Sequence, residues 1–304
     1  MNYGNILTAT WKTIWKDKAI IGFGMLMVIA PALIGLAIGG AMAFSSVEQL
    51  ENFVESDFSN LAILIFFLVY FTFIAGSIFL SALSFAGTMK GALMAQERTA
   101  PLTFSELWEA SLPYFWRMLG VMFSVGFVLM LIYMVPMILM VLVGALTAGI
   151  GFLCVFPLLI FLIPLGIVGY LMLSLSMAAL VAEDGNVVET LQRAWNVMKS
   201  KFWPLVLMTV ILYFIQMGIG MIIAIPMNML QFAFIIPMQN GSTDPDAIFR
   251  YLGIFFAIFM PLTALMQGFA LTYVNSAWML SFKEITEAPA ASAEEEDEIV
   301  TYDA

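Results

Sequence analysis

The sequence contains no histidine and only one cysteine, and these two scarcities remove whole classes of functional site. Without histidine, the chain lacks the commonest general base and a common metal ligand. Cys154 alone can form neither an intrachain disulfide nor a thiolate cluster, and its apolar neighbours favour an inert thiol. We therefore expect no catalytic residues, no metal site and no cofactor, and we interpret the protein as non-enzymatic.

Charged residues are the next scarcity, because they make up 11% of the chain while hydrophobic residues make up 62%. A soluble domain typically carries about 25% charged residues, since water must wet its surface. Eight of the acidic residues lie beyond Lys283, and removing them from the formal net charge of −10 leaves only −2 for the preceding part. The basic surface that a nucleic-acid partner requires is missing, so we expect lipid surroundings and no nucleic acid.

Six long uncharged runs account for most of the chain. About 20 apolar residues cross a bilayer, because a helix rises ~1.5 Å per residue and the hydrocarbon core is ~30 Å thick. The runs cover residues 19–44, 61–89, 118–145, 150–182, 204–237 and 251–282. They predict an all-α fold, a polytopic membrane bundle of six transmembrane helices that forms one domain over residues 1–283. The acidic segment 284–304 is too polar to pack, and we expect it to be a disordered cytoplasmic tail.

Lysine and arginine predict the orientation of the bundle, because both are enriched in cytoplasmic loops. Placing the N-terminus inside puts ten of the eleven basic residues in the cytoplasm and leaves only Arg250 outside. We therefore expect both termini on the cytoplasmic side of the membrane.

Three segments that precede the first, third and fifth spans alternate apolar and polar residues with helical periodicity. They cover residues 5–15, 103–112 and 186–199. Thr103 with Glu106, and Asn186 with Glu189, match the capping-box pattern of a helix start. The pattern predicts amphipathic helices on the cytoplasmic face and three repeats of interface helix and hairpin, at about 1–90, 100–184 and 186–283.

Basic residues in and beside these segments are candidate contacts for lipid headgroups, and tryptophans accompany them as they do at membrane interfaces. The candidates are Lys12, Lys16, Lys18, Arg117, Arg193, Lys199 and Lys201. Plain anchoring in the headgroup layer accounts for the same pattern without any specific recognition.

Short motifs in these segments resemble a known family. Residues 181–185 (VAEDG), 191–195 (LQRAW) and 201–204 (KFWP) are similar to the six-span prokaryotic membrane domain attached to some glycerophosphoryl diester phosphodiesterases. Residues 11–18 and 115–117 fit the same resemblance. It implies a prokaryotic plasma (inner) membrane and a connection with phospholipid. It does not imply hydrolysis, because the chain offers no histidine for a phosphodiesterase site.

Few polar residues lie within the spans, and none of them is charged. Ion-coupled transporters usually bury at least one charged residue, so this class is disfavoured. The candidates for an intramembrane polar cluster are Gln216, Gln267, Asn275, Ser81 and Ser174. They serve either as hydrogen bonds between helices or as the lining of a polar vestibule. We expect Gln216 and Gln267 to point into the bundle, within reach of one another or of a common polar neighbour, since both lie about 20 Å from the inner boundary at ~1.5 Å per residue.

Two functions remain in competition. The first is a scaffold, regulator or lipid-associated factor at the cytoplasmic face, with membrane lipids and other membrane proteins as candidate partners. The second is a transporter or channel for neutral or lipidic substrates. The sequence does not specify the oligomeric state, and a measurement of flux in liposomes would separate the two functions.

Overall fold

The structure is a computed structural model that describes the backbone of residues 1–46, 60–147, 151–239 and 244–302, and most side chains within 1–46, 64–147, 160–228 and 244–287. Within these ranges the regular elements are all helical and no strand is present. Six helices are long and apolar enough to cross a membrane, which confirms the predicted number of spans. They are α2 (Lys18–Phe44), α4 (Asn60–Glu97), α6 (Phe115–Leu146), α7 (Gly151–Glu183), α9 (Phe202–Gln239) and α10 (Pro245–Tyr302).

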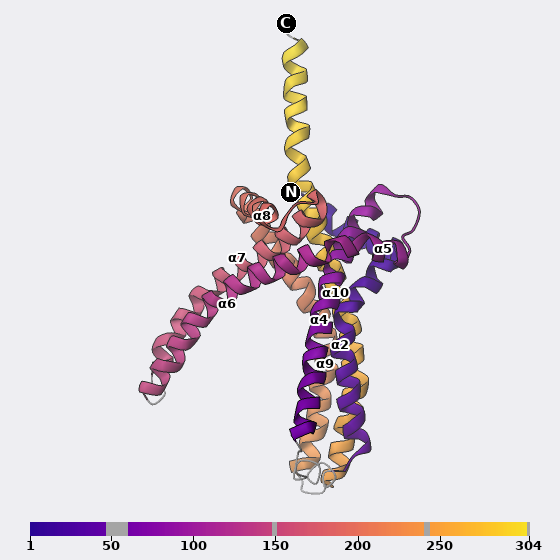
Figure 1. The fold of residues 1–304 in the computed structure, drawn as a ribbon, viewed down its shortest axis with the longest axis vertical. Coiled ribbons are helices and arrows are strands. Elements are labelled where there is room, and N and C mark those ends of the chain that lie inside the picture. Colours follow the sequence, from indigo (N-terminus) through magenta and orange to yellow (C-terminus); the bar gives the residue numbers. More distant parts are fainter. Residues whose placement is uncertain (47–59, 148–150, 240–243, 303–304) are drawn as a thin grey trace.

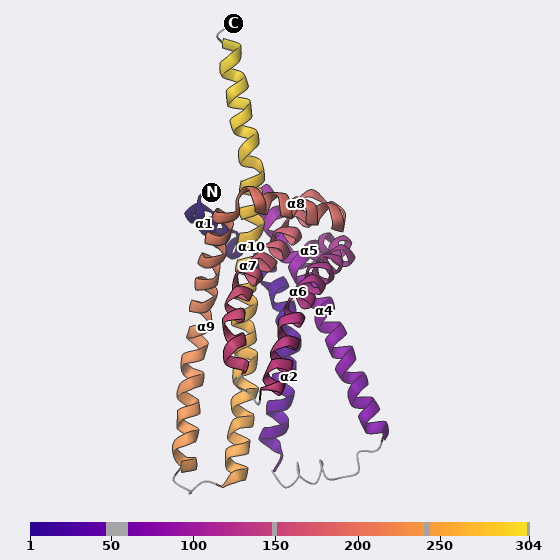
Figure 2. The ribbon, with the colours of Figure 1, turned by 90° about the vertical axis from the view of Figure 1, so that its left-hand side faces the viewer.

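The long helices diverge from a junction near the two chain ends. Figure 1 shows α2, α4, α9 and α10 as one elongated bundle, with the hairpin of α6 and α7 leaning away from it. In the turned view of Figure 2, α4 and α9 lie on either side of α2 and α10. The N-terminus lies at the end of the bundle from which the hairpin departs, and α10 extends beyond this end toward the C-terminus. We refer to this end as the terminus end.

Helices α2 and α10 pack closely because glycines remove the side chains between them. Gly35 and Gly39 are four residues apart on α2, as Gly253 and Ala257 are on α10. A Cβ atom at Gly39 would meet the main-chain nitrogen of Ala257, and the Gly253 carbonyl oxygen at 2.7 Å. Small residues at this spacing let membrane helices approach to backbone contact. The first and last spanning helices therefore form the central pair of the bundle.

The buried core lies at the terminus end, where α4, α6, α7, α9 and α10 converge. Its largest fully buried side chains include Trp278, Phe282, Met118 and Leu171. Away from this junction α2 and α10 stay together, while the other spanning helices expose large apolar side chains such as Phe71 and Leu139. A contiguous apolar surface of this kind suits contact with lipid rather than water.

Shorter helices occupy the three segments that the sequence predicted to be helical. They are α1 (Tyr3–Lys16), α5 (Phe104–Ser111) and α8 (Val187–Ser200), and a turn of 3-10 helix, η1 (Leu112–Tyr114), follows α5. The predicted capping boxes are present at the starts of α5 and α8. At the first of them, the Thr103 main-chain N–H donates to the Glu106 carboxylate at 3.0 Å and the Thr103 hydroxyl donates at 2.9 Å. These hydrogen bonds lower the pKa of Glu106, because they favour its charged form.

The start of the chain is fastened to α10 and α9 at this junction. The Asn2 main-chain nitrogen donates to Glu284 Oε1 at 2.6 Å, although 282 positions separate the two residues. The Tyr3 hydroxyl donates to the Pro204 carbonyl at 3.2 Å, which joins α1 to α9. Helix α1 is thus held by the last two spanning helices rather than by its sequence neighbours alone.

The acidic tail, for which disorder over residues 284–304 stays a prediction, begins within α10. Helix α10 continues without interruption to Tyr302. Alanine and glutamate, which dominate this segment, are strong helix formers, and extending an existing helix needs no new nucleus. The Cys154 side chain lies outside the described residues.

Candidate functional site

The seven predicted headgroup residues divide into paired and unpaired groups. Arg117 and Arg193 bond to acidic residues, and Lys16 donates to the Arg98 carbonyl oxygen at 2.7 Å. The other four are exposed and form no ion pair with any residue whose side chain the structure describes. These four, which we call the unpaired lysines, are Lys12, Lys18, Lys199 and Lys201.

Exposed tryptophans accompany the basic residues. Five of the seven tryptophans in the chain are between 42% and 77% exposed, and each lies within four residues of a lysine or arginine. They are Trp11, Trp15, Trp116, Trp195 and Trp203. Tryptophan is enriched where a membrane meets water, because its ring is apolar while its N–H can bond to water or headgroups. These five tryptophans lie on α1, on α8 and at the starts of α6 and α9.

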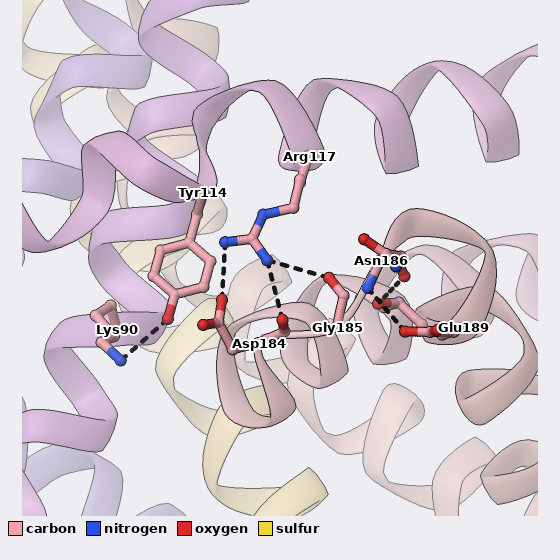
Figure 3. Close-up of polar contacts among 8 residues, drawn as sticks. Lys90, Tyr114, Arg117, Asp184, Gly185, Asn186 and Glu189 are labelled. Carbon is pink, nitrogen blue, oxygen red and sulfur yellow. Dashed lines mark hydrogen bonds and ion pairs between the residues drawn. The ribbon is translucent and has the colours of Figure 1, made fainter.

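Arg117 joins the start of α6 to the turn between α7 and α8, as Figure 3 shows. Its Nη2 donates to Asp184 Oδ1 at 2.7 Å, and its Nη1 donates to the carbonyl oxygens of Asp184 and Gly185 at 3.0 and 3.2 Å. Asp184 has a φ of 52°, a left-handed conformation that costs a residue with a side chain about 1 kcal/mol or more. The guanidinium therefore stabilises a turn that is unfavourable by itself.

Tyr114 connects this arginine to α4. Its ring lies 5.1 Å from the guanidinium carbon of Arg117 and 5.2 Å from Lys90 Nζ, which also donates to the Tyr114 hydroxyl at 3.3 Å. The tyrosine is only 7% exposed. Lys90, Tyr114, Arg117 and Asp184 thus form a continuous set of contacts from α4 to the start of α8 (Figure 3). We call this set the Arg117 clamp.

Replacing Arg117 with alanine should loosen α8. Hydrogen bonds to charged groups contribute about 1.5–3 kcal/mol, and we expect the lower end because the Arg117 side chain is 30% exposed. Amide hydrogen exchange over residues 184–200 should become faster. Arg117→Lys should restore protection only in part, since an ammonium group cannot match the planar fork of the guanidinium.

Arg98→Ala is the matched control for this prediction. The Arg98 ion pair with Glu106 spans 3.6 Å between half-exposed side chains, so its loss should leave exchange in α8 unchanged. Equal acceleration in both variants would show that the Arg117 clamp does not position α8.

No hydrogen bond joins the predicted intramembrane polar residues to one another in the described part of the chain. Asn275 is 4% exposed and donates from Nδ2 to the Thr88 hydroxyl at 3.2 Å, which joins α10 to α4. Ser81 instead donates to the Ser77 carbonyl of its own helix at 2.7 Å. Ser174 is buried on α7. The sequence identified Asn275 but not its partner Thr88, which lies two residues before Lys90.

The predicted pairing of Gln216 with Gln267 is wrong. Gln267 is exposed on α10, and neither amide forms a hydrogen bond with any residue that the structure describes. The adjacent Gly268 packs against Met25 of α2, so position 267 points away from this interface by the ~100° that separates neighbouring helical residues. Depth along a helix could be calculated from the sequence, but the face on which each glutamine lies could not.

Asp17 is a buried charged residue that the sequence analysis did not single out. It is 1% exposed, and one of its oxygens accepts a hydrogen bond from the Leu102 main-chain N–H at 2.8 Å. The other oxygen has no hydrogen-bond partner among the described residues. The bond fastens the segment before α5 to the junction of α1 and α2. An acid between Lys16 and Lys18, directly before an apolar run, was the available indication.

Two cavities lie beside the α6–α7 hairpin. One of about 400 Å³ lies among α6, α7 and α8, and nearly all of its lining is apolar; we call it the α8 pocket. The other, of about 270 Å³, lies between α7 and α9. Its lining includes the polar side chains of Tyr170, Thr209, Tyr213 and Gln216.

No protein-family model, no curated protein and no solved structure matches this chain. The fold by itself defines the class, a helical protein with six candidate membrane-spanning helices.

Proposed function

We propose that this protein is a non-enzymatic, lipid-associated scaffold or regulator of a prokaryotic plasma membrane, with its terminus end in the cytoplasm. The observation that carries the proposal is the occurrence of the unpaired lysines together with exposed tryptophans at this end. Anionic lipids of the cytoplasmic leaflet attract basic residues near the surface by about 1 kcal/mol each. Lysines without acidic partners keep this attraction available for lipid.

The three short helices support the same proposal. Helices α1, α5 and α8 each precede a pair of spanning helices, and all three lie at the terminus end. In the proposed arrangement they are amphipathic helices in the headgroup layer, one for each of three repeats. Such helices bind through buried apolar area and through attraction to anionic lipid. The resemblance of residues 181–204 to a phospholipid-connected family points in the same direction.

The alternative function is a transporter or channel for neutral or lipidic substrates. The cavity between α7 and α9 favours it, because Gln216 and three hydroxyl-bearing side chains line a space of about 270 Å³ at the level of the spanning helices. Convergent polar groups in a small cavity are a common property of ligand sites. Flux of a neutral solute through protein-containing liposomes would support this alternative.

The lipid preference of the full-length protein in nanodiscs tests the proposal. We expect phosphatidylglycerol to be enriched around the protein relative to phosphatidylcholine. Replacing Lys12, Lys18 and Lys201 together with glutamine should reduce this enrichment, by about fivefold per lysine if each contributes about 1 kcal/mol. Raising the salt concentration should reduce it as well, since exposed charges are screened.

Arg250→Gln is the control, because it removes an exposed positive charge at the start of α10, at the opposite end of the bundle. It should leave the lipid preference unchanged. An equal loss in the control, or an unchanged preference in the triple variant, would contradict the proposed role of the terminus end.

A further inference from the structure

We infer that the α8 pocket holds one acyl chain of an anionic phospholipid whose phosphate contacts Lys199. The inference rests on the proposed function and names the lipid site within it. The pocket has a volume of about 400 Å³, within the range of small-molecule sites at roughly 300–1,000 Å³. Its wall on α6 includes Val125, Val128 and Leu129, and Val168 of α7 faces the same space.

Helix α8 provides the remaining wall of this pocket. Leu191 and Trp195, one helical turn apart, line it, so the apolar face of α8 lies over the hairpin. The helix is held in this place at its start by the Arg117 clamp, and the ion pair between Arg193 Nε and Glu183 Oε1 at 2.9 Å joins it to the end of α7. The pocket is therefore a built feature of three packed helices and differs from the open lipid-facing surface of the hairpin.

The positive charge of Lys199 beside the pocket favours an anionic headgroup. Lys199 Nζ lies 4.9 Å from the centre of the Trp195 ring, which itself lines the pocket. The other charged groups of this region are engaged: Glu189 in the capping box and Arg193 with Glu183. Lys199 has no acidic partner among the described side chains. An apolar pocket with an unpaired cation beside it is complementary to an acyl chain that ends in a phosphate.

The size of the pocket decides between a lipid chain and a protein helix. A helix with its side chains is about 10–12 Å across, too wide for a space of this volume bounded by three helices. A single acyl chain has no such width, and it carries no backbone polar groups that would need hydrogen bonds inside an apolar lining. The occupant to which the pocket fits is therefore a phospholipid chain.

Native mass spectra of the full-length protein, titrated with phosphatidylglycerol in detergent, test this inference. Val128→Trp places an indole in the pocket and should weaken retention of the lipid by about tenfold, since lost chain contacts accumulate per methylene. Val135→Trp is the matched control, because Val135 lies on the same helix outside the pocket and is 58% exposed, against 55% for Val128. Equal retention of the lipid by the two variants would show that the α8 pocket does not hold the acyl chain.

The headgroup contact has its own measurement. Lys199→Gln should abolish the preference for phosphatidylglycerol over phosphatidylcholine at this site, and an undiminished preference would overturn the assignment of Lys199. Glycerol phosphate, which has the same headgroup chemistry but no chain, should not be retained. Retention of glycerol phosphate would assign the site to a soluble phosphate compound and would contradict the inference that a phospholipid occupies it.

A fluorescence experiment keeps the inference testable where Val128→Trp does not fold. Phosphatidylglycerol brominated on its acyl chain should quench the emission of Trp195, measured as the difference between the wild-type protein and Trp195→Phe. If the two proteins are quenched equally, the acyl chain does not lie beside Trp195 and the inference is wrong. The proposed function fails separately, because its triple variant of Lys12, Lys18 and Lys201 leaves the pocket and Lys199 unchanged.

Discussion

Replacing Gly39 with leucine should prevent α2 from packing on α10, whereas the same replacement at the neighbouring Gly40 should be tolerated. A Cβ at position 39 would meet backbone atoms of α10, the Gly253 carbonyl oxygen at 2.7 Å and the Ala257 Cα at 2.8 Å. Backbone atoms cannot rotate away as side chains do, so the helices must separate. At Gly40 the described atoms leave open space, with nothing within 4 Å.

The alanine variants give the graded form of this prediction. Gly39→Ala should destabilise the protein by about 1–3 kcal/mol, the usual cost of overpacking a close contact. Gly40→Ala should be neutral or slightly stabilising, because alanine favours a helix over glycine by about 0.5–1 kcal/mol. Thermal unfolding in detergent, followed by size-exclusion chromatography, measures both. Equal midpoints for the two alanine variants would show that the α2–α10 contact does not limit stability.

Trp278→Ala should produce the second large loss of stability. The Trp278 side chain is 1% exposed and is the largest of those fully buried in the described part of the chain. Its Nε1 donates to the Tyr170 hydroxyl at 3.1 Å, which joins α10 to α7. Alanine would leave a cavity and remove this hydrogen bond, and large-to-small substitutions of Trp or Phe in cores cost about 3–5 kcal/mol.

Two further variants separate the packing of Trp278 from its hydrogen bond. Trp278→Phe keeps most of the ring but removes the donor, and Tyr170→Phe removes only the acceptor, so each should cost about 1 kcal/mol. Trp203→Ala is the control for the loss of an indole, because Trp203 is 77% exposed and should change stability by less than about 0.5 kcal/mol. A Trp278→Ala protein as stable as Trp203→Ala would refute the importance of the α7–α10 contact.

Much of this architecture could be predicted from local patterns in the sequence. Uncharged runs predicted six spans, and the structure has six helices that are long and apolar enough. The capping boxes at Thr103 and Asn186 were predictable because a helix start depends on residues only three positions apart. Hydrophobic runs and capping boxes each depend on residues within one segment of the chain. Predicting them therefore requires no knowledge of which segments lie side by side in the fold.

Contacts between helices were beyond the same reasoning. The glutamine pair failed because Gln267 lies on an exposed face of α10, and the rotation of a helix about its axis does not follow from depth along the sequence. The sequence showed Gly35 and Gly39 at the spacing of close-packed helices, but did not show that α10 was their partner. Thr88 and Asp184 were likewise not predicted as hydrogen-bond partners, because the residues that donate to them, Asn275 and Arg117, lie far away in the sequence.

The fastening of the chain's first residues to its last helix also sets the order of events during synthesis. Asn2 bonds to Glu284 across 282 positions, and the glycine face of α2 has its partner only when α10 has been made. At about 5–20 residues per second, roughly 10–40 s pass between the synthesis of Gly39 and that of Gly253. Throughout that interval α2 remains in the bilayer without its partner helix. A chain truncated before Gly253 therefore lacks the helix on which the glycine face of α2 packs.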